Sequence, residues 1–212
     1  MSNYILYTDS CVDLTEEQAQ EMQLEVIPLA VNIEGKTYLN YLDGREISTQ
    51  KFYQLLREHK VTSTSQVNPQ QFVDEWTPAL EAGKDILYIA FSSALSGTYN
   101  SAAIAAQELS ETFPDRKLIV VDSKCASMGE GLLVTYAYRL KKAGKSIEEV
   151  ANWIEENKQN ISHLFTVGDL NHLKRGGRLS YSKALLGTIL RVKPLLHVST
   201  EGKLVQTGMT RG

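Results

Sequence analysis

Hydroxyl side chains cluster in residues 91–101, whose sequence is FSSALSGTYNS. The cluster falls between an apolar run that predicts a buried strand and an alanine-rich run that predicts a helix. A turn from a strand into a helix directs free N–H groups and the positive end of the helix dipole toward the adjacent space. Ser93, Ser96 and Thr98 add hydroxyl donors there, and Gly97 lets a ligand approach the backbone. This combination predicts the binding of a carboxylate or a phosphate. The alternative is that Ser96 or Thr98 only caps the helix.

A second candidate site carries positive charge. Lys174, Arg175 and Arg178 surround a pair of glycines in the segment KRGGR. Three cations around a flexible turn can clamp a phosphate or face an acidic partner. The alternative is an ordinary solvated turn.

Other catalytic and metal-binding patterns are missing from the sequence. It contains neither the G-x-S-x-G pattern of a nucleophile elbow nor a P-loop. No histidine lies in a recognisable triad context; the four are His59, His163, His172 and His197. Asp9 and Asp122 follow predicted strands and could bind a metal, although such aspartates more often cap the next turn. The two cysteines lie outside any C-x-x-C pair, so we predict neither a metal nor a cofactor.

The composition is that of an ordinary globular protein. The chain has 212 residues, of which 42% are hydrophobic and 22% charged. Its net charge of -3 at pH 7 gives no support to nucleic-acid binding, which requires a basic face. No apolar run approaches the length of a membrane span, and the first residues lack a signal-peptide pattern. We therefore expect a cytoplasmic protein.

The elements that must position these residues alternate along the chain. We predict strands at 4–8, 26–33, 36–38, 85–90, 117–121, 163–167, 193–198 and 203–206, and helices at 49–59, 68–83, 102–109, 131–142, 146–157 and 182–190, with a first helix that begins near 15. Residues 61–66 are predicted as a hydroxyl-rich loop. Glu34-Gly35 and Glu201-Gly202 are predicted as two-residue hairpin turns. Strands that alternate with helices predict an α/β fold in three layers, with a mainly parallel sheet.

Three of the predicted strands end in serine, at Ser10, Ser92 and Ser123. The carboxyl ends of parallel strands share one edge, which is where open α/β sheets bind ligands. We divide the chain into an N-terminal α/β domain at 1–160 and the start of a smaller C-terminal α/β domain at 161–212. The second domain has few predicted elements for an independent core, so we expect it to be truncated in this chain.

Taken together, these segments resemble the DegV family of bacterial fatty-acid-binding proteins. The matching parts are spread along nearly the whole chain: Asp9-Ser10 with Asp13-Leu14, Thr64-Ser65-Gln66, residues 92–101, Asp122-Ser123 with residues 126–131, residues 174–178, and Lys193-Pro194. The resemblance implies two α/β domains with an extended fatty acid between them. It also implies that hydroxyls of the Thr-Ser-Gln and Ser-Gly-Thr segments hold the carboxylate, here Thr64 and Ser96, with Ser65, Ser93, Gly97 and Thr98 beside them.

The resemblance further implies a partner. Such proteins present the bound acid to a separate ATP-dependent fatty acid kinase, which makes the acyl phosphate used in phospholipid synthesis. The chain itself would then be no enzyme, and the fatty acid would be its only ligand. Members of the family run some tens of residues longer than this chain.

A fatty-acid tail requires an apolar pocket. Burying each methylene is worth about 0.8 kcal/mol, so roughly 14 methylenes would gain on the order of 10 kcal/mol. The residues that we expect to line the tail pocket are apolar and are Ile27, Leu29, Phe165, Leu185, Leu186, Ile189 and Leu195. Ordinary core packing is the alternative for each. Two other functions stay open: an enzyme that acts on a small phosphorylated or carboxylated metabolite at the same sheet edge, and a ligand-sensing regulatory domain.

Overall fold

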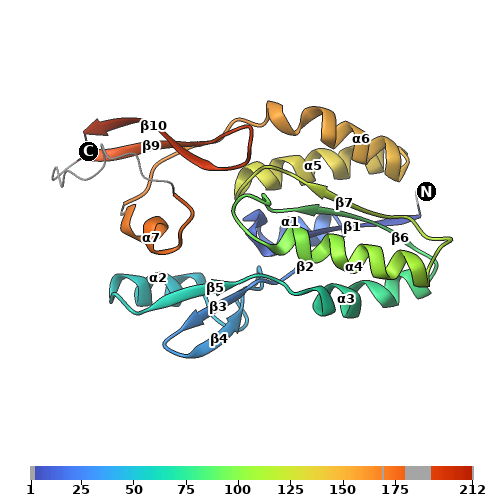
Figure 1. Cartoon of the computed structure of the whole chain (residues 1–212), viewed down its shortest axis with the longest axis horizontal. Coiled ribbons are helices and arrows are strands. Elements are labelled where there is room, and N and C mark those ends of the chain that lie inside the picture. Colours follow the sequence, from blue (N-terminus) through green and yellow to red (C-terminus); the bar gives the residue numbers. More distant parts are fainter. Residues whose placement is uncertain (1–2, 169, 180–191, 212) are drawn as a thin grey trace.

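The computed structural model describes residues 3–168, 170–179 and 192–211 (Figure 1). Its strands are β1 (Tyr4–Asp9), β2 (Leu24–Ile27), β3 (Ala30–Ile33), β4 (Lys36–Leu39), β5 (Thr62–Ser65), β6 (Asp85–Ala90), β7 (Leu118–Asp122), β8 (Leu164–Phe165), β9 (Val192–Val198) and β10 (Leu204–Arg211). Its α-helices are α1 (Glu16–Glu21), α2 (Thr49–Arg57), α3 (Pro69–Glu81), α4 (Thr98–Thr112), α5 (Met128–Lys142), α6 (Ile147–Asn157) and α7 (Leu170–Arg175). Two 3-10 turns are η1 (Ser10–Val12) and η2 (Lys158–Asn160).

A parallel sheet in the order β2-β1-β6-β7 forms the centre of the larger part of the molecule. Helices α3 and α4 cover one face, and α1, α5 and α6 cover the other (Figure 1). Successive strand residues point to opposite faces. Leu87 and Ile89 of β6 therefore pack in one apolar cluster, and Ile86, Tyr88 and Ala90 pack in the other. This three-layer arrangement confirms the predicted α/β fold.

Local sequence sets the start of several helices. The side chains of Thr15, Asn68 and Ser146 each accept a hydrogen bond from the backbone N–H three residues later. The Gln or Glu side chain at that later position accepts in turn from the backbone N–H of the first residue. Such capping boxes satisfy backbone donors that the first helical turn leaves free. All three boundaries agree with the sequence prediction.

A small antiparallel sheet, β4-β3-β5, stands apart from the parallel one. Glu34 and Gly35 form the predicted two-residue turn, with φ angles of 47° and 83°. The prediction of a loop at 61–66 is wrong, because β5 pairs with β3 and places Thr64 opposite Val31. The free edge of β3 accepts β5, and the β-branched side chain of threonine favours an extended strand.

A second antiparallel sheet, β10-β9-β8, follows the parallel part of the chain. Val198 pairs with Leu204, so residues 199–203 make the connection and the predicted two-residue turn is too short. The turn of this hairpin meets the parallel sheet, since Ser92 Oγ donates to the Gly202 carbonyl at 2.9 Å. The predicted helix at 182–190 lies outside the described residues, and the division near residue 160 stays a prediction. None of the helices in the described part of the chain has the length and apolar character of a membrane span.

Candidate functional site

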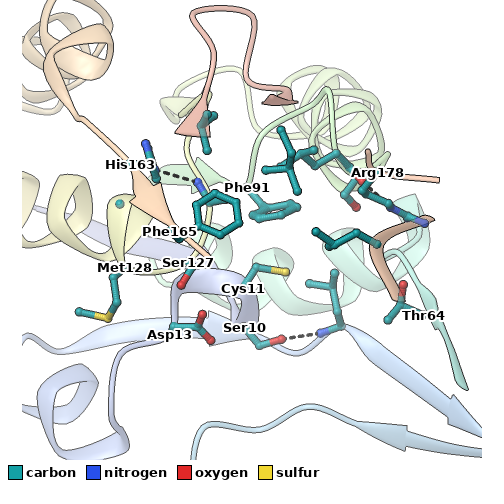
Figure 2. Close-up of a pocket in the computed structure, with 18 of the residues that line it drawn as sticks. Ser10, Cys11, Asp13, Thr64, Phe91, Ser127, Met128, His163, Phe165 and Arg178 are labelled. Atoms are coloured by element: carbon teal, nitrogen blue, oxygen red, sulfur yellow. Dashed lines mark hydrogen bonds between the residues drawn. The ribbon is translucent and has the colours of Figure 1, made fainter. Parts of the chain in front are cut away.

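A cavity of about 720 Å³ opens where the carboxyl edge of the parallel sheet meets the two antiparallel sheets (Figure 2). Its walls are mostly apolar. The parallel-sheet part contributes Ser10, Cys11, Asp13, Phe91, Leu95, Ser96, Ala126, Ser127, Met128, Gly129 and Leu132. The β3–β5 part contributes Leu29, Ala30, Val31, Asn40, Thr64, Ser65 and Gln66. The C-terminal part contributes Ile161, Ser162, His163, Leu164, Phe165, Leu173, Arg178, Val198 and Leu204.

Strand β5 and the turn before α4 meet at this cavity. Gly97 lies so close to Gln66 that a Cβ at Gly97 would collide with the amide oxygen of Gln66. Gln66 Nε2 also donates to Ser101 Oγ of α4 at 3.1 Å. The lack of a side chain at Gly97 therefore makes room for the Gln66 amide against this turn. The structure thus brings Thr64 and Ser96 to one cavity from positions that are far apart in sequence.

The hydroxyls of the turn take different places. Ser96 lines the cavity, and its Oγ lies 2.9 Å from Thr98 Oγ1. Thr98 is fully buried behind it, and Gly97 is the N-cap residue of α4, whose cap has no side-chain hydrogen bond. Ser96 Oγ does accept from the Thr98 N–H at 3.3 Å, so it supports the helix start while it faces the cavity. Ser93 is not among the lining residues and accepts from Lys124 Nζ at 2.9 Å.

The residues predicted for the tail pocket divide into three groups. Leu29 and Phe165 line the cavity. Ile27 instead packs in the apolar cluster between the parallel sheet, α3 and α4. Leu195 is not among the lining residues; Val198 of the same strand is, and residues three apart in a strand face opposite sides. The remaining three, Leu185, Leu186 and Ile189, lie outside the described residues.

Several lining residues were not predicted from the sequence. Phe91 directly follows β6, Cys11 lies on η1 just after β1, and Leu95 lies on the turn before α4. Met128 and Leu132 lie on the first turns of α5. The position of Cys11 and Phe91 just beyond buried strands is the pattern that could have indicated them. No local pattern distinguishes Met128 or Leu132 from surface residues of a helix.

The basic segment is split by the structure. Arg178 lines the cavity, and its Nε donates to the Leu95 carbonyl at 3.0 Å (Figure 2). Its guanidinium also donates to the Gly176 carbonyl. Lys174 and Arg175 are exposed at the end of α7 and are not among the lining residues. Arg178 therefore holds the loop that carries Ser96, whereas the other two cations face outward.

Two carboxylates anchor the loops at the sheet edge. Asp9 accepts from the Cys11 N–H, the Phe91 N–H and the Tyr88 hydroxyl at 2.9–3.0 Å. Burial raises the pKa of Asp9, and these three donors oppose that rise. Asp122 accepts from the Ser93 and Lys124 N–H groups and pairs with Lys124 Nζ at 2.7 Å. Both residues thus cap turns. Within residues 3–168, 170–179 and 192–211, no three His, Cys, Asp or Glu side chains are grouped to hold a metal ion.

His163 lies at the end of the cavity formed by the first turn of α5. Its Nε2 accepts from the Ala126 N–H at 3.3 Å (Figure 2), and a Cβ on Gly129 would collide with its ring. Burial lowers the pKa of His163, which agrees with a neutral ring that accepts a hydrogen bond. This end of the cavity therefore carries no fixed positive charge on His163.

The fold and the site define a class of protein. The cavity lies at the carboxyl edge of a parallel sheet, its walls are mostly apolar, and hydroxyls and a guanidinium gather beside β5 and the turn before α4. Apolar pockets with a few convergent polar groups are typical of sites for small amphipathic molecules. The chain is thus an α/β protein with the features of a small-molecule binding protein.

The particular family follows from comparison with known proteins. The family model described as "Uncharacterised protein, DegV family" matches residues 5–212, so the chain belongs to the DegV family. A DegV domain-containing protein of Clostridium perfringens, CPE0026, is 44% identical over 212 residues, which cover 100% of this chain and 72% of that protein.

Solved structures of similar proteins have the same fold. The structure described as fatty acid binding of a DegV family protein from Thermus thermophilus is 37% identical, with a TM-score of 0.86, and the match covers 99% of this chain and 72% of that one. A stearic acid-binding protein from Eubacterium ventriosum is 27% identical, with a TM-score of 0.89, over 99% of this chain and 71% of that one. The predicted family is therefore confirmed, and relatives with this fold bind fatty acids.

Proposed function

We propose that this protein binds one long-chain fatty acid in the cavity, with the carboxylate beside Thr64, Ser96 and Arg178. The observation that carries the proposal is the joining of two hydroxyl segments and a guanidinium at one place in a mostly apolar cavity. The cavity volume of about 720 Å³ lies within the roughly 300–1,000 Å³ of typical ligand pockets. Relatives of the same fold described as fatty-acid-binding support the choice of ligand.

The tail and the head group contribute differently to this binding. Burial of roughly 14 methylenes would gain on the order of 10 kcal/mol, which exceeds what a few hydroxyl contacts supply. The apolar walls therefore set the affinity, and the hydroxyls set the orientation. Ser65 lies beside Thr64 on β5 and is a further candidate donor. Gly97 and Thr98 would act through their backbone and through the position of Ser96.

The protein's role after binding is to present the acid to a partner. We propose that a separate ATP-dependent fatty acid kinase phosphorylates the bound carboxylate, and that Lys174 and Arg175 contact this kinase. Their exposure near Arg178 at the head-group region supports this assignment. The absence of a catalytic role for the chain itself, the absence of a cofactor and the cytoplasmic location stay predictions from the sequence. The size and apolar walls of the cavity favour a lipid over the small metabolite of the rival enzyme hypothesis.

The test is extraction of the purified protein with organic solvent, followed by mass spectrometry. We expect a fatty acid of membrane-lipid length in one-to-one proportion with the protein. A delipidated sample should take up added oleic or stearic acid. Repeated preparations that contain no acyl ligand and take up neither acid would contradict the proposal.

A further inference from the structure

A fully buried carboxyl group lies directly behind the cavity wall. Glu130 belongs to the first turn of α5, two residues after Met128, and its side chain points toward the parallel sheet. Oε1 of Glu130 lies 2.9 Å from Thr8 Oγ1 of β1. Its other oxygen, Oε2, is buried and has no hydrogen-bond partner among the described residues. In the same part of the chain, no lysine, arginine or histidine forms an ion pair with it.

The hydroxyl of Thr8 has one proton to donate, and this decides the protonation state of Glu130. Thr8 Oγ1 also lies 2.9 Å from the Ile89 carbonyl oxygen of β6. A hydroxyl has one proton to donate, and a carbonyl oxygen can only accept. If Thr8 donates to Ile89, the contact with Glu130 is a hydrogen bond only when Glu130 carries the proton and donates it to Thr8. An ionised Glu130 would compete with Ile89 for that one proton and leave Oε2 as an unpaired buried anion.

The surroundings of Glu130 give the same answer. The titratable groups that interact electrostatically with Glu130 are Asp9, Cys11, Asp13, Tyr88 and Cys125. None of them is a cation. Asp9 receives three donors and is therefore the group suited to carry the negative charge. Burial, and then the charge on Asp9, raises the pKa of Glu130 well above its usual value. The positive end of the α5 dipole favours the anion only weakly and supplies no donor to Oε2.

The position of Glu130 connects it with the ligand site. Met128 and Gly129 precede it on α5 and line the cavity, as does Cys11 on the facing turn η1. Gly131 follows it, and a Cβ there would lie 2.8 Å from the Val12 carbonyl, so α5 packs tightly on η1. The bond from Glu130 to Thr8 is therefore a side-chain link between this wall of the cavity and the sheet.

We propose that Glu130 is a positioning residue that works as a neutral acid: it donates its proton to Thr8 and so holds the first turn of α5, and with it the cavity wall, against the sheet. Loss of that proton should loosen the wall and speed release of the ligand. The part of this inference that concerns ligand release rests on the proposed fatty-acid function. The protonation of Glu130 does not.

The first experiment uses no ligand. Infrared difference spectra of the wild type and Glu130→Gln should show the carbonyl band of a protonated carboxylic acid at neutral pH, shifted in D₂O and lost in the variant. Because the folded pKa of Glu130 is raised, its contribution to stability is present at low pH and is lost as the pH rises through that pKa. As the pH rises from the ordinary pKa of an unfolded glutamate to the raised pKa of folded Glu130, the Tm of the wild type should therefore fall relative to that of Glu130→Gln. The amide of Glu130→Gln can still donate to Thr8 at every pH in this range. The exposed-acid variant Glu111→Gln should follow the wild type.

The second experiment measures release of a fluorescent fatty-acid analogue across the same pH range. Wild type should release it about tenfold faster at the high-pH end, which corresponds to about 1.4 kcal/mol, whereas Glu130→Gln should show a flat profile. Absence of the acid band, together with identical Tm profiles, would overturn the neutral state. Identical release profiles in proteins that do bind the analogue would overturn the positioning role. Failure to bind any fatty acid would instead count against the proposed function, and the infrared result would stand separately.

Discussion

Helices α2 and α3 follow one another in the chain and are both amphipathic, but they are buried to different extents. In α3, Phe72 and Trp76 are fully buried against the parallel sheet, in ring contact with Tyr88. In α2, none of the nine residues is buried, and Phe52 makes a ring contact with its own neighbour Tyr53. The helix pattern is similar, so the difference comes from the sheet that each part of the chain has available.

The comparison extends from the helices to the two parts of the molecule that they represent. The parallel sheet is covered on both faces and has two apolar clusters. The β3–β5 sheet has only one buried residue, Ile33, among its strand residues. Ala30, Val31 and Thr64 of this sheet instead line the cavity. The parallel-sheet part can therefore supply most of the stability, whereas the β3–β5 part has little buried apolar surface of its own.

The largest expected effect tests the difference between the two helices. Phe72→Ala should lower the free energy of unfolding by about 3–5 kcal/mol, because it empties space in a close-packed cluster. Phe52 in α2 is only half-buried, so Phe52→Ala should cost about 1 kcal/mol. Chemical denaturation of both variants measures the two values. Equal losses would mean that the β3–β5 part is as firmly packed as the parallel sheet.

A smaller effect is expected where the two parts meet around the head group. A hydrogen bond to a carboxylate is worth about 1.5–3 kcal/mol, so Ser96→Ala should weaken fatty-acid binding by about ten- to a hundredfold. Thr64→Ala, on the less buried β3–β5 sheet, should weaken fatty-acid binding by about tenfold or less. Ser110→Ala is the matched control. Ser110 lies on α4, the helix that follows Ser96, and its hydroxyl donates to the Ala106 carbonyl of the same helix.

Titration calorimetry with the acid and with its methyl ester measures these affinities. The ester should bind the wild type more weakly and be little affected by Ser96→Ala, since it lacks the charge that the hydroxyl stabilises. Thermal melts establish that each variant is folded. Unchanged acid affinity in folded Ser96→Ala and Thr64→Ala would place the carboxylate elsewhere and leave Ser96 with the helix-start role alone.

The smallest effect on binding separates the two kinds of cation in the basic segment. Arg178→Ala should weaken fatty-acid binding by up to about fivefold, the range expected for a partly exposed charge. Arg175→Ala should leave binding unchanged but reduce acyl-phosphate formation in a coupled assay with the kinase. Equal loss of binding in the two variants would mean that Arg175 also supports the ligand site. Full kinase activity in Arg175→Ala would remove the proposed kinase contact.

Features that depend on neighbouring residues were predictable from the sequence. The three capping boxes, the proline at the start of α3 and the turn at Glu34-Gly35 use bonds or dihedral preferences within a few residues. The alternation of apolar strands with helices predicted the parallel sheet, and the serines at the strand ends indicated the edge where the cavity lies. Hydrophobic periodicity and capping act locally, so the sequence carries this information in short segments.

Tertiary structure alone decided which side chains face the cavity. Leu29 lines the cavity while Ile27, two residues earlier, lies in the core, because β2 ends between them and the chain leaves the parallel sheet. Thr64 belongs to a strand only because β3 offers a free edge. Glu130 looks like an ordinary first-turn acid in the sequence, and it becomes a buried group only when α5 packs on β1 and β6. Contacts such as Gln66–Ser101 and Thr8–Glu130, 35 and 122 residues apart, set these outcomes, and no local pattern records which segments will meet.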